Sequence, residues 1–231
     1  MIHRYKDEDK VLVAVDCIIF GFDQTEEDLK LLLIKRNFEP EKGKWSLMGG
    51  FLHLDETLDE AATRVLFTLT GLRNVYLEQL KAYSLPDRDP VERTISVTYY
   101  ALINIEQHDE ELIKQYSARW VKISKIPKLI FDHNDMVSHA IQQLRYRTST
   151  QPIGFELLPA KFTMRQLQKL YEEILDQKLD KRNFTKKINS LGILEKLSEK
   201  DKRSSKKGSF LYKFNQKKYL MKSQNGFEFK M

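Results

Sequence analysis

The 231-residue sequence has one cysteine, nine glycines and six prolines, and it lacks any long uninterrupted apolar run. A single cysteine excludes a disulfide framework, and we expect Cys17, within the apolar segment 11–20, to be a buried small hydrophobic side chain. Asp16 interrupts that segment, which is far shorter than the roughly 18 residues of a membrane-spanning helix. The 41% of hydrophobic residues and the scarcity of glycine and proline exclude a disordered or collagen-like chain. We expect a cytoplasmic globular protein with no membrane span.

Positive charge is concentrated in the last third of the chain. The total is +6, but residues 1–150 have 20 Lys and Arg against 24 Asp and Glu, whereas residues 151–231 have 19 against 9. Such asymmetry is typical of a nucleic-acid-binding appendage, although basic surfaces also occur on proteins that bind no nucleic acid.

The periodic spacing of apolar residues is lost at 148–160, where two prolines and a glycine occur, so we place a linker there. The predicted domains are 1–150 and 151–231.

In the N-terminal part, some segments repeat apolar residues with the period of a strand and others with the period of a helix. Three segments are β-rich or alternate apolar and polar residues, as strands do, and two others repeat apolar residues at helical spacing. A mixed sheet with flanking helices, which is an α+β arrangement, is therefore predicted. The predicted strands are 11–20, 29–36 and 94–103, and the predicted helices are 57–70, ended by Gly71, and one around 136–144 with Asp132 as its N-cap.

Residues 50–72 read GFLHLDETLDEAATRVLFTLTGL and resemble the Nudix box. In that motif, five residues separate a glycine from a glutamate, and seven residues separate this glutamate from an Arg-Glu pair. The motif then continues with an aliphatic residue, any residue, a Glu-Glu pair, any residue, a glycine and an aliphatic residue. The lead-in at 45–50, WSLMGG, is similar to the usual approach to this box. The resemblance implies a Nudix fold and, in the family, hydrolysis of nucleoside diphosphates with divalent cations. The positions in register are Gly50, Glu56, Arg64, Leu66, Gly71 and Leu72.

Three positions of the box have lost their carboxylates. Where the family has glutamate, this chain has Val65, Thr68 and Leu69. Carboxylates at these positions would share one helix face and hold the divalent cations that polarise a diphosphate and activate water. Glu56 alone leaves one carboxylate, and its partner in the motif, Arg64, is equally compatible with a structural ion pair. We therefore expect no metal, no cofactor, no catalytic residue and no hydrolase activity.

The C-terminal part has the element order of a winged helix-turn-helix. Thr163 begins a capping box before an apolar helical stripe, and Asp180 can cap a second, basic helix that Gly192 ends. In this arrangement the second helix enters the major groove of DNA, and a basic loop between two strands contacts the phosphates or enters the minor groove. A small helical appendage with solvated lysines is the alternative. The predicted strands are 193–197 and 210–214, around the loop 198–209.

Residues 158–172 and 179–188 are very similar to the C-terminal domain of the Nudix-related transcriptional regulators of the NrtR type, and 88–90 and 93–97 are similar to their front domain. The resemblance covers nearly the whole chain. It implies a homodimeric regulator that binds a palindromic double-stranded operator and responds to a small molecule in the Nudix pocket. One branch senses ADP-ribose, and the AraR branch of Bacteroidetes senses L-arabinose. Because a neutral sugar needs no bound cations, the degenerate box favours arabinose.

We therefore expect a DNA-binding repressor with L-arabinose as its effector and ADP-ribose as the alternative. An active hydrolase with a basic appendage would need carboxylates from outside the box, such as Asp87 and Asp89, and an RNA-binding regulator is a third possibility. The expected DNA contacts are Lys181, Asn183, Lys186 and Lys187 in the second helix and Arg203, Lys206 and Lys207 in the loop. The expected effector contacts, which flank the box or the next loop, are Lys44, Trp45, Glu56, Arg88 and Asp89.

Overall fold

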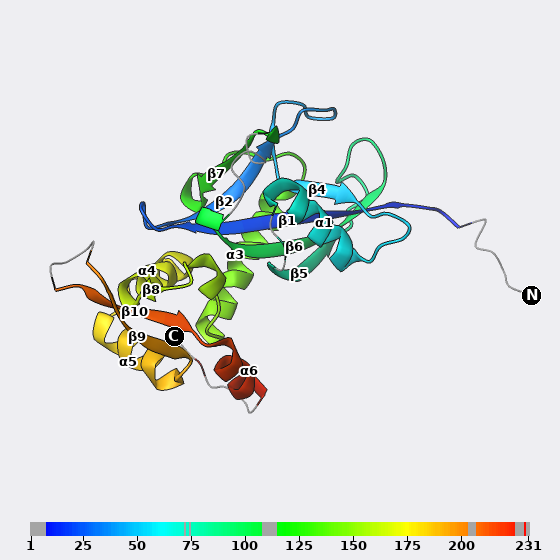
Figure 1. The fold of residues 1–231 in the computed structure, drawn as a ribbon. Helices are drawn as coiled ribbons and strands as arrows, with labels where there is room; N and C mark the ends of the chain where they lie inside the picture. Colours follow the sequence, from blue (N-terminus) through cyan, green and yellow to red (C-terminus); the bar gives the residue numbers. More distant parts are fainter. Residues whose placement is uncertain are drawn as a thin grey trace, which may run out of the picture.

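The computed structural model describes residues 8–71, 73, 75–107, 115–202, 207–224 and 229. A seven-stranded mixed sheet is followed by a smaller unit of helices and a three-stranded sheet (Figure 1). Within the described residues, we find no helix with the length and apolar character to cross a membrane. The elements of the first part are β1 (Leu12–Asp23), β2 (Asp28–Lys35), β3 (Trp45–Ser46), β4 (Met48–Phe51), α1 (Leu58–Thr70), β5 (Tyr76–Tyr83), β6 (Thr94–Asn104), β7 (Ala118–Lys122) and α3 (His133–Thr150).

The central strand of the large sheet is β1, which pairs parallel with β6 and antiparallel with β2 and β4. Its long apolar run is buried on both faces because helices cover both sides of the sheet. Helix α1 packs Ala61, Val65 and Leu69 against one face, and α3 packs on the other. The predicted α+β arrangement and the predicted strands are confirmed. Cys17 is fully buried, as expected, and burial raises the pKa of its thiol.

Two local expectations about the helices of this part have different outcomes. Helix α1 begins with a capping box formed by Thr57 and Glu60, and ends at Gly71, whose φ of 69° is the left-handed conformation that glycine adopts without strain. Helix α3 also begins where predicted, after Asp132, but the Asp132 side chain makes no capping hydrogen bond. The expectation of a cap was wrong because Arg88 occupies both carboxylate oxygens.

The second part contains the predicted helices and hairpin. The capping box at Thr163 and the cap by Asp180 are both present, and the apolar stripe of the second helix is buried. The strands of the hairpin are longer than predicted, so the loop between them is shorter, and a further helix follows that the sequence pattern did not indicate. The elements are β8 (Phe162–Thr163), α4 (Met164–Leu175), α5 (Lys181–Leu191), β9 (Leu194–Asp201), β10 (Ser209–Phe214) and α6 (Gln216–Gln224).

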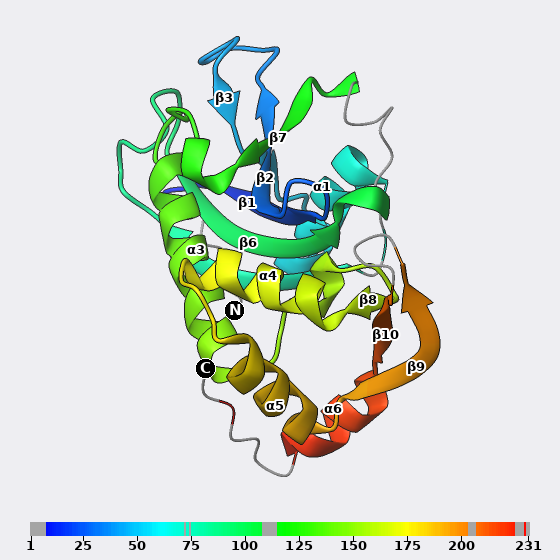
Figure 2. The ribbon, with the colours of Figure 1, turned by 90° about the vertical axis from the view of Figure 1, so that its left-hand side faces the viewer.

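The segment 148–160, expected to be a linker, is packed into the protein, and its first three residues are the end of α3. Ile153, Phe155, Leu157 and Leu158 are all buried, and they belong to one apolar core that continues from the large sheet to α4 and α5. Prolines and a glycine remove its periodicity, but its apolar side chains still require burial. Helix α4 lies between the large sheet and α5 (Figure 2). The two parts are therefore joined by a continuous packed interface.

Candidate effector pocket and DNA-binding surface

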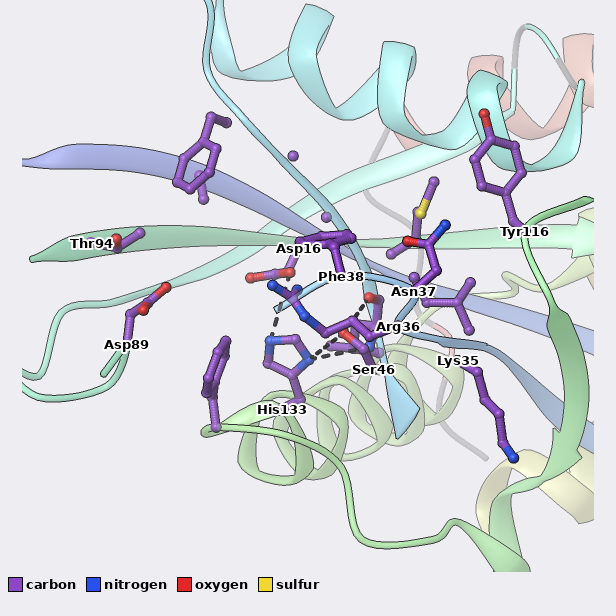
Figure 3. Close-up of a pocket in the computed structure, with 18 of the residues that line it drawn as sticks. Asp16, Lys35, Arg36, Asn37, Phe38, Ser46, Asp89, Thr94, Tyr116 and His133 are labelled. Atoms are coloured by element: carbon purple, nitrogen blue, oxygen red, sulfur yellow. Dashed lines mark hydrogen bonds and ion pairs between the residues drawn. The ribbon is translucent and has the colours of Figure 1, made fainter. Parts of the chain in front are cut away.

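A cavity of about 290 Å³ opens on the first part of the chain, lined by residues of β1, β2 and β4, of the loop 84–93 and of the first turn of α3. Figure 3 shows Asp16, Ser46 and His133 gathered around Arg36, with Asp89 on one side and Tyr116 on the other. The wall combines buried charged groups with aromatic rings. Such a combination suits a ligand that carries both charge and a flat apolar ring.

Asp16 is the buried carboxylate of the cavity. It interrupts the apolar run of β1, and its side chain is 10% exposed. Ser96 Oγ donates a hydrogen bond of 2.5 Å to its Oδ2. Its two oxygens also lie 3.8 Å from His133 Nε2 and 3.9 Å from Arg88 Nη2. A buried carboxylate is stable only with such partners, so these contacts explain how β1 accommodates a charge in mid-strand.

His133 lies in the wall as a neutral side chain. The backbone N–H of Leu47 donates to its Nδ1 over 3.1 Å, which assigns the ring proton to Nε2. Nε2 faces the Asp16 carboxylate. Burial lowers the pKa of His133 and outweighs the opposite effect of the nearby carboxylates. The histidine therefore links α3 to the loop between β3 and β4 without adding a charge to the cavity.

Arg88 connects the cavity to α3 through a buried bidentate ion pair. Its Nε and Nη2 donate to the two oxygens of Asp132 over 2.9 and 2.8 Å, and the arginine side chain is 3% exposed. Burial opposes the charged form, but the bond to Asp132 outweighs it and raises the pKa of Arg88. Because Arg88 also lines the cavity, a ligand there meets a guanidinium whose position is fixed and whose charge is shared with Asp132.

A second guanidinium, that of Arg36, lies beside exposed aromatic rings. Its central carbon is 4.0 Å from the centre of the Phe38 ring, and its Nε donates to the carbonyl of Pro40 over 2.7 Å. Phe38 and Phe51 both line the cavity and are more than half exposed. An arginine stacked on an aromatic ring remains able to bind phosphate or carboxylate. This side of the cavity therefore provides an anion contact next to surfaces for a flat ring.

Gly49 is required by the close approach of β4 to Asp16. A Cβ at this position would lie 2.3 Å from Asp16 Oδ1 and 3.0 Å from the carbonyl oxygen of Val15. We expect Gly49→Ala to displace the Asp16 side chain and to lower the free energy of unfolding by about 1–3 kcal/mol, as overpacking does. Urea denaturation measures this loss. Gly43→Ala is the control, since its Cβ meets no atom within 4 Å and only the positive φ of 81° adds strain. An equal loss in both variants would contradict the steric account.

Two of the five effector contacts predicted from sequence, Arg88 and Asp89, line this cavity. The other three lie outside its wall. Lys44 is exposed and pairs with Glu41, while Trp45 lies under Lys35, whose Nζ is 5.4 Å from the ring centre. Glu56 is bound by Arg64, which donates to it over 2.9 and 2.5 Å and lowers the pKa of the Glu56 carboxyl to about 2.

The sequence prediction missed Asp16, Arg36 and His133, which the fold brings together from three distant segments. One signal was present, because a carboxylate inside the buried apolar run of β1 needs a buried partner. No local pattern indicates that the partners come from residues 88 and 133.

The three degenerate positions of the Nudix box do not fit a divalent cation. Val65 and Leu69 are 3% and 0% exposed and face the sheet, so they contribute no oxygen ligand. The Thr68 hydroxyl donates to the carbonyl of Arg64 in the preceding turn. Among the residues that the structure describes, no three His, Cys, Asp or Glu side chains are grouped as a metal site. Hard divalent cations require several oxygen ligands, which this helix face does not supply.

Helix α5 presents a polar, basic face to solvent. Phe184, Ile188 and Leu191 anchor its other side in the core. Of the predicted DNA contacts, Lys181, Asn183 and Lys186 are exposed, but Lys187 is partly buried, with its Nζ 5.9 Å from the ring centre of Phe229. The prediction omitted Arg182 and Asn189, which are exposed and lie with Lys186 opposite the buried stripe.

The hairpin that follows α5 adds a second basic surface. Lys207 is exposed, while Arg203 and Lys206, the other predicted contacts in the loop, lie outside the described residues. On the strands, the half-exposed ring of Phe210 has two lysine ammonium groups over it, Lys196 at 3.8 Å and Lys200 at 4.6 Å. These lysines, like the exposed basic residues of α5, are cations that a phosphate backbone can contact.

Comparisons with known proteins agree with both parts of this description. Residues 10–140 match the model of the NUDIX domain, and residues 154–214 match that of the NrtR DNA-binding winged helix domain. The chain is 33% identical over 216 residues to the "ADPR responsive transcriptional repressor NtrR" of Acinetobacter baylyi, covering 92% of this chain and 85% of the relative. It is also 39% identical over 126 residues to an ADP-ribose pyrophosphatase of Methanocaldococcus jannaschii, covering 54% of this chain and 70% of that protein.

A solved structure has the same two-part architecture. The crystal structure of Shewanella oneidensis NrtR complexed with a 27mer DNA superposes with a TM-score of 0.81 at 24% identity, over 90% of this chain and 95% of that one. At this identity the likeness concerns the fold. Together with the full-length relative and both domain matches, it shows that the chain belongs to the NrtR family, as a DNA-binding transcriptional regulator with a Nudix effector domain.

Proposed function

We propose that this regulator is a repressor controlled by ADP-ribose, or by a close nucleoside diphosphate analogue, bound in the cavity around Arg88. The observation that carries the proposal is the Arg36 guanidinium, which stacks on Phe38 in a cavity that Arg88 and further aromatic rings also line. A diphosphate and an adenine ring would match these groups, whereas a neutral pentose would leave the charges unused. The full-length relative described as ADP-ribose responsive supports the same choice.

The expectation of L-arabinose as effector finds no support in these comparisons. It rested on the loss of the metal-binding glutamates, on the premise that a diphosphate needs bound cations. That premise did not consider cationic side chains. Lys35, Arg36 and Arg88 all line the cavity, so a diphosphate has cationic contacts there without a metal, although Arg88 shares its charge with Asp132.

ADP-ribose hydrolysis is the second candidate function, since one relative is an ADP-ribose pyrophosphatase. We propose that this chain binds the nucleotide without cleaving it, because Val65 and Leu69 face the core where the motif requires carboxylates. Purified protein incubated with ADP-ribose and Mg²⁺ is expected to release no AMP above the uncatalysed rate, as measured by chromatography. Turnover that requires both Mg²⁺ and this protein would contradict the proposal.

A thermal-shift titration tests the choice of effector. A ligand that binds only the folded state adds about 2.7 kcal/mol of stability at a concentration one hundred times its Kd. We expect ADP-ribose to raise the melting temperature equally with Mg²⁺ and with a chelator, and L-arabinose to leave it unchanged. A shift with arabinose alone would return the assignment to a sugar-responsive regulator.

The proposed operator is a palindromic double-stranded site bound by a homodimer. One α5 helix presents a short basic face, and two copies related by a two-fold axis would read two half-sites. Sedimentation of the complex with a duplex selected by this protein from a random pool is expected to show two chains per duplex. Single-stranded RNA of equal length should not compete, and effective competition would favour an RNA-binding regulator.

A further inference from the structure

Helix α3 contacts the effector cavity with its first turn and α4 of the DNA-binding part with its last turns. It has 18 residues, which corresponds to a length of about 27 Å. Met136, Val137, Ala140 and Leu144 pack its central part against the large sheet. A packed helix moves as a rigid element, so a displacement at one end reaches the other.

At the effector end, two groups bind α3 to the cavity wall. Asp132 immediately precedes the helix and holds Arg88, while His133 in the first turn accepts the Leu47 N–H and faces Asp16. An anionic ligand that contacts Arg88 either competes with Asp132 for the guanidinium or displaces Arg88 and Asp132 as one unit. In either case, ligand occupancy changes the contact that positions the start of α3.

At the other end, Arg145 binds α3 to the helix-turn-helix. Its Nε donates to the carbonyl of Ile174 over 3.0 Å, and its Nη2 donates to Asp176 Oδ2 over 3.2 Å. Asp176 is the C-cap of α4 and begins the turn that leads into α5. Arg145 therefore contacts the start of the turn that precedes the helix that we expect in the major groove. Nearby, Arg147 pairs with Glu78 on β5 and keeps the end of α3 on the sheet.

We propose that α3 couples effector binding to DNA binding, with the Arg88–Asp132 pair as its contact to the effector and Arg145 as its contact to the turn before α5. The proposal rests on the proposed function and adds the route by which the two sites communicate. The ligand changes DNA affinity only as far as it prefers one position of α3 over another.

A second contact between the two parts provides a matched control. Glu27, in the turn between β1 and β2, accepts from Arg165 at 3.2 Å and lies 3.7 Å from Lys169, both on α4. This ion pair joins the same two parts but involves neither α3 nor the cavity. Both contacts are solvent-accessible, so Arg145→Gln and Glu27→Gln should each leave the fold intact.

The experiment measures the Kd for a selected duplex with and without saturating ADP-ribose, using the full chain and both variants. For the wild type we expect the duplex Kd with ADP-ribose to be about 5 to 150 times the Kd without it, which is the usual range of coupling between two sites. This quotient is the coupling ratio. Arg145→Gln should bind ADP-ribose with unchanged Kd and bring the ratio close to one, while Glu27→Gln should keep it. A wild-type ratio in Arg145→Gln would overturn the proposed role of α3 while leaving the proposed function in place. Loss of the ratio in both variants would do the same, because the effect would then not be specific to the α3 contact. Absence of ADP-ribose binding by the wild type would overturn the proposed function as well.

Discussion

Replacing Arg182 and Lys186 together by alanine is expected to reduce operator affinity by about 100-fold or more. Both side chains are exposed on α5 opposite its buried stripe, so the variant should fold normally. A guanidinium that contacts base edges contributes about 1–3 kcal/mol, and each tenfold change in Kd corresponds to about 1.4 kcal/mol. Fluorescence anisotropy at several salt concentrations measures both the affinity and the salt dependence, which should fall because cationic contacts are lost.

Lys217→Ala with Lys218→Ala is the control for that experiment. It removes the same charge from exposed positions on α6 in the same part of the chain. If its loss of affinity equals that of the α5 variant, binding depends on overall charge rather than on the face of α5. A small loss in the control together with a large one in the α5 variant identifies α5 as the recognition helix.

Arg88→Leu is expected to destabilise the protein by about 3–5 kcal/mol, because it leaves Asp132 and Asp16 without their buried cation. Arg64→Leu is the comparison, since it breaks a more exposed pair with Glu56 and is expected to cost much less stability. Urea denaturation gives both free energies. The double variant Arg88→Leu with Asp132→Leu should recover part of the loss. Equal, small losses in the two single variants would show that the Arg88–Asp132 pair is not the buried anchor described above.

The fold was predictable because its elements have strong local signals. The apolar period, the terminator Gly71 and the caps at Thr163 and Asp180 correctly located α1, α4 and α5. Where a side chain had a non-local partner, local inference failed. Asp132 was expected as a cap but binds Arg88, and Lys187 was expected on the free face of α5 but lies toward Phe229.

The pocket was the least predictable feature, because its wall is assembled from residues far apart in the sequence. Arg36, Arg88 and His133 contribute to one cavity only through the topology of the sheet and the placement of α3. Proximity to the Nudix box was a poor guide, since Lys44, Trp45 and Glu56 are near it in sequence but lie outside the cavity wall. The charged residues of the cavity wall likewise lie outside the box.

The central claim is that this regulator releases DNA in response to an intact nucleotide. The most direct test titrates ADP-ribose, without added metal, into the complex of this 231-residue chain with a selected duplex, and then analyses the recovered nucleotide by chromatography. We predict a saturable loss of DNA binding and quantitative recovery of ADP-ribose, with no effect of L-arabinose. Unchanged DNA binding at saturating ADP-ribose, or release that occurs only as the nucleotide is cleaved, would contradict this account.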